Sequence, residues 1–335
     1  MFKFRKPLLV MGAGLLMSLS LLAGCGSVKP SSEAAAVSAK PGEGSAVAST
    51  GTAASASEGK TIKHMWGTTQ LKKVPQKIVA LDFAYIDMLT ALEVNPVASV
   101  GIGESSFPEY LKDRFNAKNV INVGQAKQPN LEVLKSVKPD LIIASPNRHE
   151  MIKSQLAEIA PTIALDDSSY QAILSNFTNL ADVLDKKEQA DKVKKGIAEK
   201  IASAQEKVKN KPSVLVVGAF EDDSTVWLKS SFIGSLLTEI GTNYLFEGKK
   251  DLSAAESKTD IAKLSLERLG EFNPDYVFMY GEPGKWLNNP LYKNLKAVKE
   301  NKAVEVSRDL WSKGRGPLAA DLILEQAVKI MTGGK

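Results

Sequence analysis

Residues 168–210 read SSYQAILSNFTNLADVLDKKEQADKVKKGIAEKIASAQEKVKN and divide the chain into two halves of similar character. The stretch contains no proline and only one glycine, Gly196. Its apolar residues recur at the helical spacing i, i+4, i+7, i+10 and i+11, at Ile173, Phe177, Leu180, Val183 and Leu184. This pattern predicts either one long connecting helix or two abutting helices, spanning up to roughly 60 Å if unbroken.

The half before this stretch alternates short apolar runs with amphipathic ones. The runs predicted as strands are KIVALD (77–82), PVASVGI (96–102), DLIIAS (140–145) and PTIALD (161–166). The stretches predicted as helices are 84–92, 130–138 and 151–159. Alternation at this spacing favours a parallel or mixed sheet with helices on its faces.

The same alternation resumes after residue 210. The predicted strands are 213–220, 274–281 and 303–311, and the predicted helices are 232–241, 265–273 and 317–332. We therefore expect two Rossmann-like α/β lobes, residues 60–167 and 211–335, joined by a connecting helix at 168–210. A cleft between two such lobes is the expected place for a ligand.

The first 24 residues have the layout of a secretory signal peptide. Lys3, Arg5 and Lys6 form a positive region, and an apolar run from Leu8 to Leu22 follows it. The word Leu22-Ala23-Gly24-Cys25 matches the lipobox of bacterial lipoproteins, in which the cysteine becomes the lipidated N-terminus. Cys25 is the single cysteine of the chain, so an intramolecular disulfide is excluded. The protein is therefore expected to be lipid-anchored to the cell membrane, on its extracytoplasmic face.

Residues 25–59 are rich in serine, alanine, glycine and threonine and contain no aromatic residue. Such a composition predicts a disordered linker behind the lipid anchor. The formal charge of the chain is +5, and Lys3, Arg5 and Lys6 leave with the signal peptide, so the mature protein carries about +2. A nucleic-acid partner would require a basic stripe, which the chain lacks.

Arginine and aromatic residues follow the predicted strands at their carboxyl ends, where open α/β sheets bind ligands. In the first lobe they are Phe83, Tyr85 and Arg148, and in the second they are Trp227, Tyr280, Trp286, Arg308 and Arg315. Arg315 lies between two glycines in DLWSKGRGPLAADLILEQ (309–326), just before a predicted helix that starts at Pro317. Free N–H groups at a helix start add positive potential, so this loop is an expected anion site.

Catalytic and metal-binding alternatives find little support in the residues. The chain has only His64 and His149, and no G-x-S-x-G motif is present. The stretch GIGESS (101–106) lacks the third glycine of a dinucleotide-binding loop. Two histidines are too few for a protein-ligated zinc or manganese site. A surface hydrolase that uses His149 stays open as an alternative, but we expect no enzyme and no metal ligands.

The order of these parts resembles the substrate-binding lipoproteins of bacterial ABC importers, and specifically the helical-backbone class (class III periplasmic binding proteins). The motifs that carry the resemblance are VPQKIVALD (74–82), NLEVLKSVKPDLIIAS (130–145), RHE with LAEIAPTI (148–163) and WSKGRGPLAADLIL (311–324). The pairing of RHE with the late GRGPLAA resembles the branch that binds ferric citrate and citrate-based or hydroxamate siderophores.

This resemblance implies a ferric siderophore as transported ligand, with its iron already coordinated, so that no cofactor is needed. Arginine suits such an anionic chelate because its planar fork pairs with carboxylates. Haem, cobalamin and catecholate siderophores remain alternative ligands. The resemblance also implies an ABC permease and its ATPase as partners of a monomeric protein, with Glu150 and Glu239 docking to the permease. Lobe opening is expected to be small.

Overall fold

A computed structural model describes residues 59–220, 224–248 and 260–333. The predicted signal peptide, Cys25 and the predicted linker up to residue 58 lie outside these residues. One compact unit runs from Ser55 to Lys335. Within the described ranges, no helix has the length and apolar character that crossing a bilayer requires.

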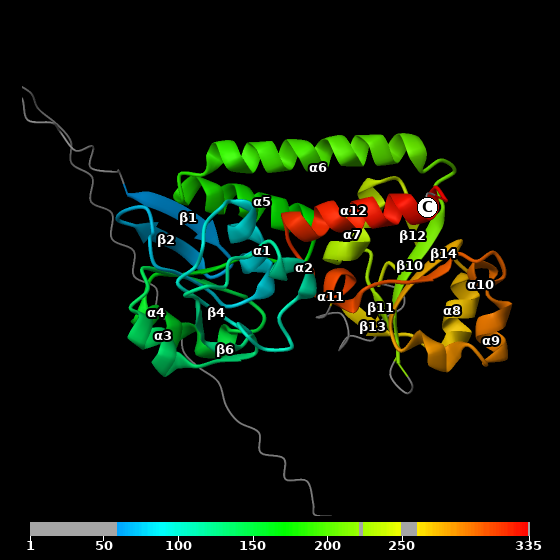
Figure 1. Cartoon of the computed structure of the whole chain (residues 1–335), viewed down its shortest axis with the longest axis horizontal. Helices are drawn as coiled ribbons and strands as arrows, with labels where there is room; N and C mark the ends of the chain where they lie inside the picture. Colours follow the sequence, from blue (N-terminus) through cyan, green and yellow to red (C-terminus); the bar gives the residue numbers. More distant parts are fainter. Residues whose placement is uncertain (1–58, 221–223, 249–259, 334–335) are drawn as a thin grey trace, which may run out of the picture. The chain divides into compact units, whose positions relative to one another are not determined.

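The N-terminal lobe is built on a five-stranded parallel sheet with the strand order β5-β4-β3-β8-β9 (Figure 1). Its strands are β3 (Ile78–Ala80), β4 (Ala98–Ser99), β5 (Ile121–Asn122), β8 (Leu141–Ala144) and β9 (Thr162–Ala164). Its helices are α1 (Phe83–Ala91), α2 (Glu109–Lys112), α3 (Leu131–Val137), the 3-10 turn η1 (Glu150–Ile152) and α4 (Lys153–Ile159). Two hairpins complete the lobe, β1 (Lys60–His64) with β2 (Gly67–Leu71), and β6 (Gly124–Gln125) with β7 (Gln128–Pro129).

The sheet of this lobe separates two hydrophobic clusters because successive residues of a strand point to opposite faces. Val79 and Ile142 pack on one face, whereas Ala80 and Ile143 pack on the other. Both faces are covered by helices, which explains why these strands are apolar throughout.

The C-terminal lobe has a mixed sheet with the order β13-β11-β10-β14-β15, and β12 also pairs with β10. Its strands are β10 (Ser213–Ala219), β11 (Thr225–Trp227), β12 (Asn243–Tyr244), β13 (Ile261–Lys263), β14 (Tyr276–Gly281) and β15 (Ala303–Glu305). Its helices are α7 (Phe232–Glu239), α8 (Leu266–Phe272), the 3-10 turn η3 (Pro283–Trp286), α9 (Pro290–Asn294), α10 (Lys296–Lys299), α11 (Arg308–Trp311) and α12 (Pro317–Met331). The prediction of a strand over 303–311 was wrong in its second half, because the chain leaves the sheet after Glu305 and forms α11.

The connecting region consists of two helices, α5 (Tyr170–Val183) and α6 (Lys187–Lys207), rather than one unbroken helix. The chain turns at Asp185, whose φ of 54° lies in the left-handed region and ends the helical path. Helix α6 then lies along α5, as Figure 1 shows, and spans roughly 30 Å toward the second lobe.

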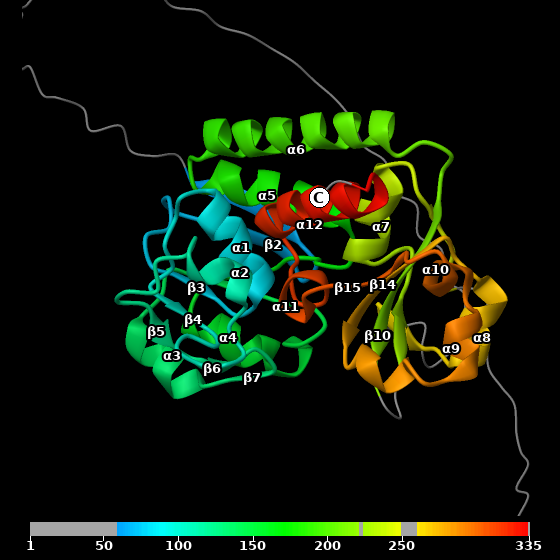
Figure 2. The same cartoon turned by 45° about the vertical axis from the view of Figure 1, so that its right-hand side comes forward.

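Helix α12 lies at the junction of the two lobes although it ends the chain (Figure 2). It packs against α6, α1 and α5 as well as against α7 and α11 of its own lobe. Its apolar residues, among them Ile323 and Leu324, join one hydrophobic cluster that extends from the first sheet through α5 to the second sheet. The two lobes therefore share a continuous core.

Candidate functional site

Three polar groups gather at the carboxyl ends of the parallel strands in the first lobe. Asp82 follows β3, Arg148 follows β8 and Asp167 follows β9. The side chain of Asp82 accepts a hydrogen bond from Ala84 N–H at 3.1 Å, so the same residue caps α1.

The guanidinium of Arg148 pairs with Asp82, and its Nη1 lies 3.6 Å from Asp167 Oδ2. Asp82 and Asp167 are both buried, while the Arg148 side chain is one-third exposed. The neighbouring carboxylate of Asp82 raises the pKa of Arg148, so this guanidinium is a permanent charge in the site.

Arg315 approaches the same place from the loop between α11 and α12. Its Nη1 lies 3.3 Å from Asp167 Oδ2 and 3.0 Å from Asp260 Oδ2. Its guanidinium also stacks over the ring of Trp227, with Cζ 5.2 Å from the ring centroid. These contacts fix Arg315 between a carboxylate of the first lobe and an aromatic ring of the second.

A cavity of about 220 Å³ lies between the lobes at this point. It is lined by Ser145, Asn147, Arg148, Asp167, Trp227, Asp260, Ile261 and Arg315. Three of the predicted site residues, Arg148, Trp227 and Arg315, are thus brought together, and they come from both lobes.

The charges in the site are mixed. Two guanidiniums face the carboxylates of Asp82, Asp167 and Asp260, and burial raises the pKa of Asp260 while Arg315 acts in the opposite direction. The indole Nε1 of Trp227 is buried and has no hydrogen-bond partner among the residues that the structure describes. The site therefore offers planar cationic donors that already hold carboxylate oxygens, which is the chemistry that recognises an anionic oxygen ligand.

The other predicted aromatic residues do not line the cavity. Tyr85 is fully buried, and its hydroxyl donates to the carbonyl of Leu165 at 2.8 Å. Tyr280 is also buried, where it packs edge-on against Phe220 with the ring centroids 6.2 Å apart. Phe83 is half-buried and packs edge-on against Phe107.

Arg308 is exposed at the start of α11, and its guanidinium stacks over Phe220 at 5.3 Å from the ring centroid. It lies at the carboxyl side of β15 but does not line the 220 Å³ cavity.

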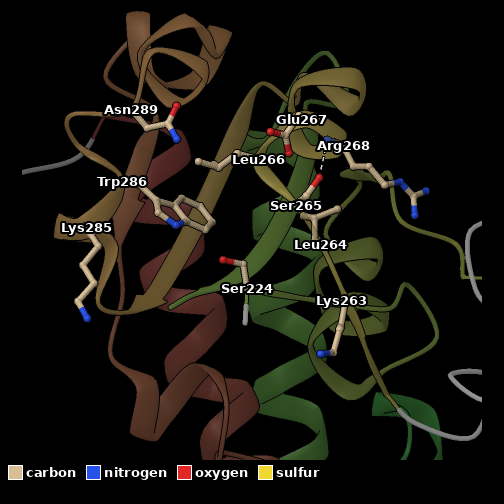
Figure 3. A pocket seen from close by; sticks show the side chains of 10 residues that line it. All are labelled: Ser224, Lys263, Leu264, Ser265, Leu266, Glu267, Arg268, Lys285, Trp286 and Asn289. Carbon is tan, nitrogen blue, oxygen red and sulfur yellow. Dashed lines mark hydrogen bonds between the residues drawn. The ribbon is translucent and has the colours of Figure 1, made fainter. Parts of the chain in front are cut away.

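Trp286 lines a different hollow, of about 530 Å³, on the second lobe alone (Figure 3). This hollow lies between the start of α8 and η3, and Leu266 and Trp286 form its apolar wall. Neither Arg148 nor Arg315 contributes to it.

His149 has a structural position. It is fully buried, its Nδ1 accepts from Ser145 N–H at 2.9 Å, and its Nε2 lies 2.7 Å from the carbonyl oxygen of Ala126. Both ring nitrogens are therefore occupied, and burial lowers the pKa of the ring. This geometry leaves no nitrogen free to act as a general base.

The two predicted docking residues lie in different surroundings. Glu150 is exposed at the start of η1, just after the strand end that carries Arg148. Glu239 ends α7, and its carboxylate accepts from Gln171 Nε2 of α5. Glu239 thus lies beside the connecting helices rather than near the cavity.

Sequence reasoning missed Asp82 and five residues that line the cavity, namely Ser145, Asn147, Asp167, Asp260 and Ile261. Asp82 is the last residue of one predicted strand and Asp167 directly follows another, so the rule of strand carboxyl ends could have found them. Asp260 carried no local signal. Among the described residues, no group of histidine, cysteine and acidic side chains is arranged to hold a metal ion.

Two α/β lobes bridged by helices, with an arginine from each facing one cavity, define a two-lobed ligand-binding protein. Residues 78–310 match the periplasmic binding protein family, and the chain belongs to that family. Its relatives include the Fe(3+)-citrate-binding protein YfmC of Bacillus subtilis, with 30% identity over 283 residues, or 81% of this chain and 86% of YfmC. The Fe(3+) dicitrate-binding periplasmic protein FecB of Escherichia coli is 27% identical over 279 residues, covering 81% of this chain and 89% of FecB.

Solved structures agree with this assignment. Staphylococcus aureus SirA in complex with staphyloferrin B superimposes with a TM-score of 0.71 at 26% identity, covering 81% of this chain and 98% of SirA. Bacillus subtilis FeuA, complexed with ferri-bacillibactin, superimposes with a TM-score of 0.70 at 23% identity, over 82% of this chain and 99% of FeuA. The second likeness shows the shared fold.

Proposed function

We propose that the chain is an extracytoplasmic binding protein that captures a ferric siderophore of the citrate or hydroxamate type between its lobes. It then delivers this ligand to an ABC permease. The names of YfmC and FecB support ferric citrate as the ligand class. The lipobox at Cys25 supports a lipid anchor, and release of a Cys25→Ser variant from the cell membrane tests it.

The observation that carries this proposal is the meeting of Arg148 and Arg315 at one carboxylate oxygen. Their Nη1 atoms lie 3.6 Å and 3.3 Å from Asp167 Oδ2, and the two arginines come from separate lobes. A carboxylate of the ligand would take the same place, because two guanidiniums aimed at one oxygen position favour an anionic donor there.

Ligand binding requires this arrangement to open. The cavity of about 220 Å³ is smaller than the roughly 300–1,000 Å³ typical of small-molecule sites. An incoming chelate must therefore displace Asp167 from the arginines or separate the lobes slightly. Either route frees the guanidiniums to contact a carboxylate of the ligand.

The test is a titration of the purified protein with ferric citrate and, separately, with a ferric hydroxamate. Quenching of tryptophan fluorescence measures binding. Arg315→Ala should weaken binding roughly 10- to 100-fold, because it removes charge-assisted contacts to the ligand. Arg268→Ala is the matched control, since Arg268 lines the hollow on the second lobe and should leave the affinity unchanged.

Haem, cobalamin and a ferric triscatecholate belong in the same titration. Tight binding of one of these, with none of ferric citrate or hydroxamate, would contradict the ligand class. Light scattering of the ligand-loaded protein tests the monomeric state that we propose.

We also propose that the permease recognises one acidic residue on each lobe, Glu150 and Glu282. Glu150 follows β8 and is the first residue of η1, and Glu282 follows β14 and directly precedes η3, so the order of elements is the same. Each strand pairs with the first central strand of its sheet, β3 or β10, so the two positions are topologically equivalent. Both residues are exposed, and Glu282 therefore replaces Glu239 as our candidate for the second lobe.

A further inference from the structure

Asp87 is a carboxylate without any exposed surface, in the middle of α1. Its Oδ1 accepts from Leu318 N–H at 2.8 Å, and its Oδ2 accepts from Ala319 N–H at 2.9 Å. The hydroxyl of Tyr110 donates to Oδ2 at 3.0 Å. Asp87 is thus satisfied by two backbone amides of α12, more than 200 positions further along the chain.

These amides belong to the first turn of α12, where a helix has no internal acceptors for its N–H groups. The helices α1, α3, α5, α7, α8 and α9 each begin after an Asp, Asn or Ser whose own side chain caps the first turn. At α12 the preceding residue is Gly316, which has no side chain, and no local side chain caps the helix. Asp87 therefore acts as the N-cap that the sequence around α12 does not supply.

Gly316 is required by the closeness of this contact. A Cβ atom built on Gly316 would lie 2.2 Å from Cγ of Asp87, so any larger residue would displace the carboxylate. Gly316 directly follows Arg315, and the cap therefore holds the backbone next to the guanidinium that faces the cavity. From this backbone Arg315 reaches Asp167, Asp260 and the ring of Trp227.

We propose that Asp87 is a positioning residue for ligand binding, which holds Arg315 at the cavity by capping α12 across the boundary between the lobes. The effect on ligand affinity rests on the proposed function, whereas the effect on the position of Arg315 does not.

Burial of the Asp87 carboxylate is energetically unfavourable, so stability alone does not explain an acidic residue at this position. Burial raises its pKa to about 7, against the opposing hydrogen bonds from Leu318, Ala319 and Tyr110 and the nearby charge of Arg114. An apolar residue would fill the same space without this desolvation cost. A buried carboxylate is favourable here because it accepts hydrogen bonds from the free N–H groups of α12 and lies at the positive end of this helix.

The first experiment reads the position of Arg315 without any ligand. Full-length mature protein labelled with 5-fluorotryptophan gives one fluorine NMR signal for each of its four tryptophans. The signal of Trp227, assigned with Trp227→Phe, reports the guanidinium stacked over it. Asp87→Asn and Asp87→Ala should shift this signal and leave the signal of Trp66 unchanged.

Asp140→Asn is the matched control. Asp140 also accepts from backbone amides, those of Gln76 and Lys77, but it precedes β8 at the end of the sheet opposite to the cavity. It should leave the Trp227 signal in place. An unchanged Trp227 signal in folded Asp87→Ala would overturn the proposal, whatever ligand the protein binds.

The second experiment is a double-mutant cycle on ferric citrate affinity. Asp87→Asn should weaken binding about tenfold, as the loss of a helix cap predicts. In the Arg315→Ala background the same change should alter affinity less than twofold, because Asp87 acts through Arg315. Equal tenfold losses in both backgrounds would overturn the positioning role. If the unmodified protein binds no ferric chelate, the proposed function fails, and the fluorine signal still decides the role of Asp87.

Discussion

Asp167 contacts both cavity arginines through one oxygen, and we expect this geometry to influence which ligands the site prefers. The carboxylate lies in the first lobe, one arginine lies beside it, and the other reaches it from the second lobe. In the absence of ligand it gives each guanidinium a second carboxylate partner, in addition to Asp82 for Arg148 and Asp260 for Arg315. A ligand with a free carboxylate can take the place of Asp167 at these donors, so we expect the site to favour such a ligand over one without an anionic oxygen.

At the same scale, the docking proposal makes a prediction for single glutamates. Glu150→Ala and Glu282→Ala should each lower uptake of radioactive ferric citrate by cells about tenfold, because each removes one charged contact with the permease. The affinity of the purified variants for ferric citrate should stay unchanged, since neither residue lines the cavity. Glu239→Ala should leave uptake normal. Impaired uptake with Glu239→Ala and normal uptake with Glu282→Ala would reverse our assignment.

At the scale of elements, the start of β14 is tied to the start of β10 by a polar link. Asp275 Oδ2 accepts from the backbone N–H and the hydroxyl of Ser213, both at 2.8 Å, and Asp275 also pairs with Lys296. The hydroxyl of Ser213 in turn accepts from Asp275 N–H at 2.9 Å. The two central strands of the second lobe thus begin in a fixed register, which the hydrophobic pattern alone would specify less strongly.

This link predicts a pH-dependent contribution to stability. The contact with Lys296 lowers the pKa of Asp275 to about 2, with help from the hydrogen bonds of Ser213. A lowered pKa means that the ionised group stabilises the fold above about pH 4 and that this contribution is lost as the pH falls toward 2. Asp275→Asn should lower the free energy of unfolding by about 1–2 kcal/mol at pH 7.

The measurement is urea denaturation at several pH values. The difference between Asp275→Asn and the unmodified protein should shrink below pH 4. Asp113→Asn, at an exposed position after α2, should change stability by less than about 0.5 kcal/mol. A difference for Asp275→Asn that stays constant down to pH 2 would contradict the role of the charge.

At the scale of the whole molecule, the two lobes are joined by packing as well as by sequence. The hydrophobic cluster that includes Ile143 of the first sheet and Phe278 of the second continues through α5 and α12. Asp87 of the first lobe also accepts hydrogen bonds from two backbone amides of α12. Neither lobe buries its own apolar surface fully, so the lobes are expected to move only slightly relative to each other.

This shared core predicts one cooperative unfolding transition for the two lobes. Calorimetry of the mature protein should give a calorimetric enthalpy equal to the van't Hoff enthalpy. Ile323→Ala, in the buried face of α12, should lower the midpoint of the whole transition and cost about 2–5 kcal/mol. Two resolved transitions, with only one of them shifted by Ile323→Ala, would show that the lobes unfold independently.

Much of this architecture could be predicted because its signals are local. The runs KIVALD and SVLVVGAF formed β3 and β10, and the helical spacing from Ile173 to Leu184 formed α5. The rule of strand carboxyl ends likewise led to Arg148, and the glycine-rich loop before Pro317 led to Arg315. The two-residue strands β5, β6, β7 and β12 were missed, and the position of the break at Asp185 between the two connecting helices was not predicted, since no periodicity marks them.

By itself the sequence determined two α/β halves, the region that joins them, and the arginines that follow their strands, because periodicity and strand ends depend on neighbouring residues. Only the tertiary structure decided that Tyr85 and Tyr280 are core residues, that Asp167 serves both arginines, and that Asp87 caps α12. Those contacts join positions far apart in the chain. They exist because packing brings the two lobes and the C-terminal helix together, and a local sequence pattern cannot predict such long-range contacts.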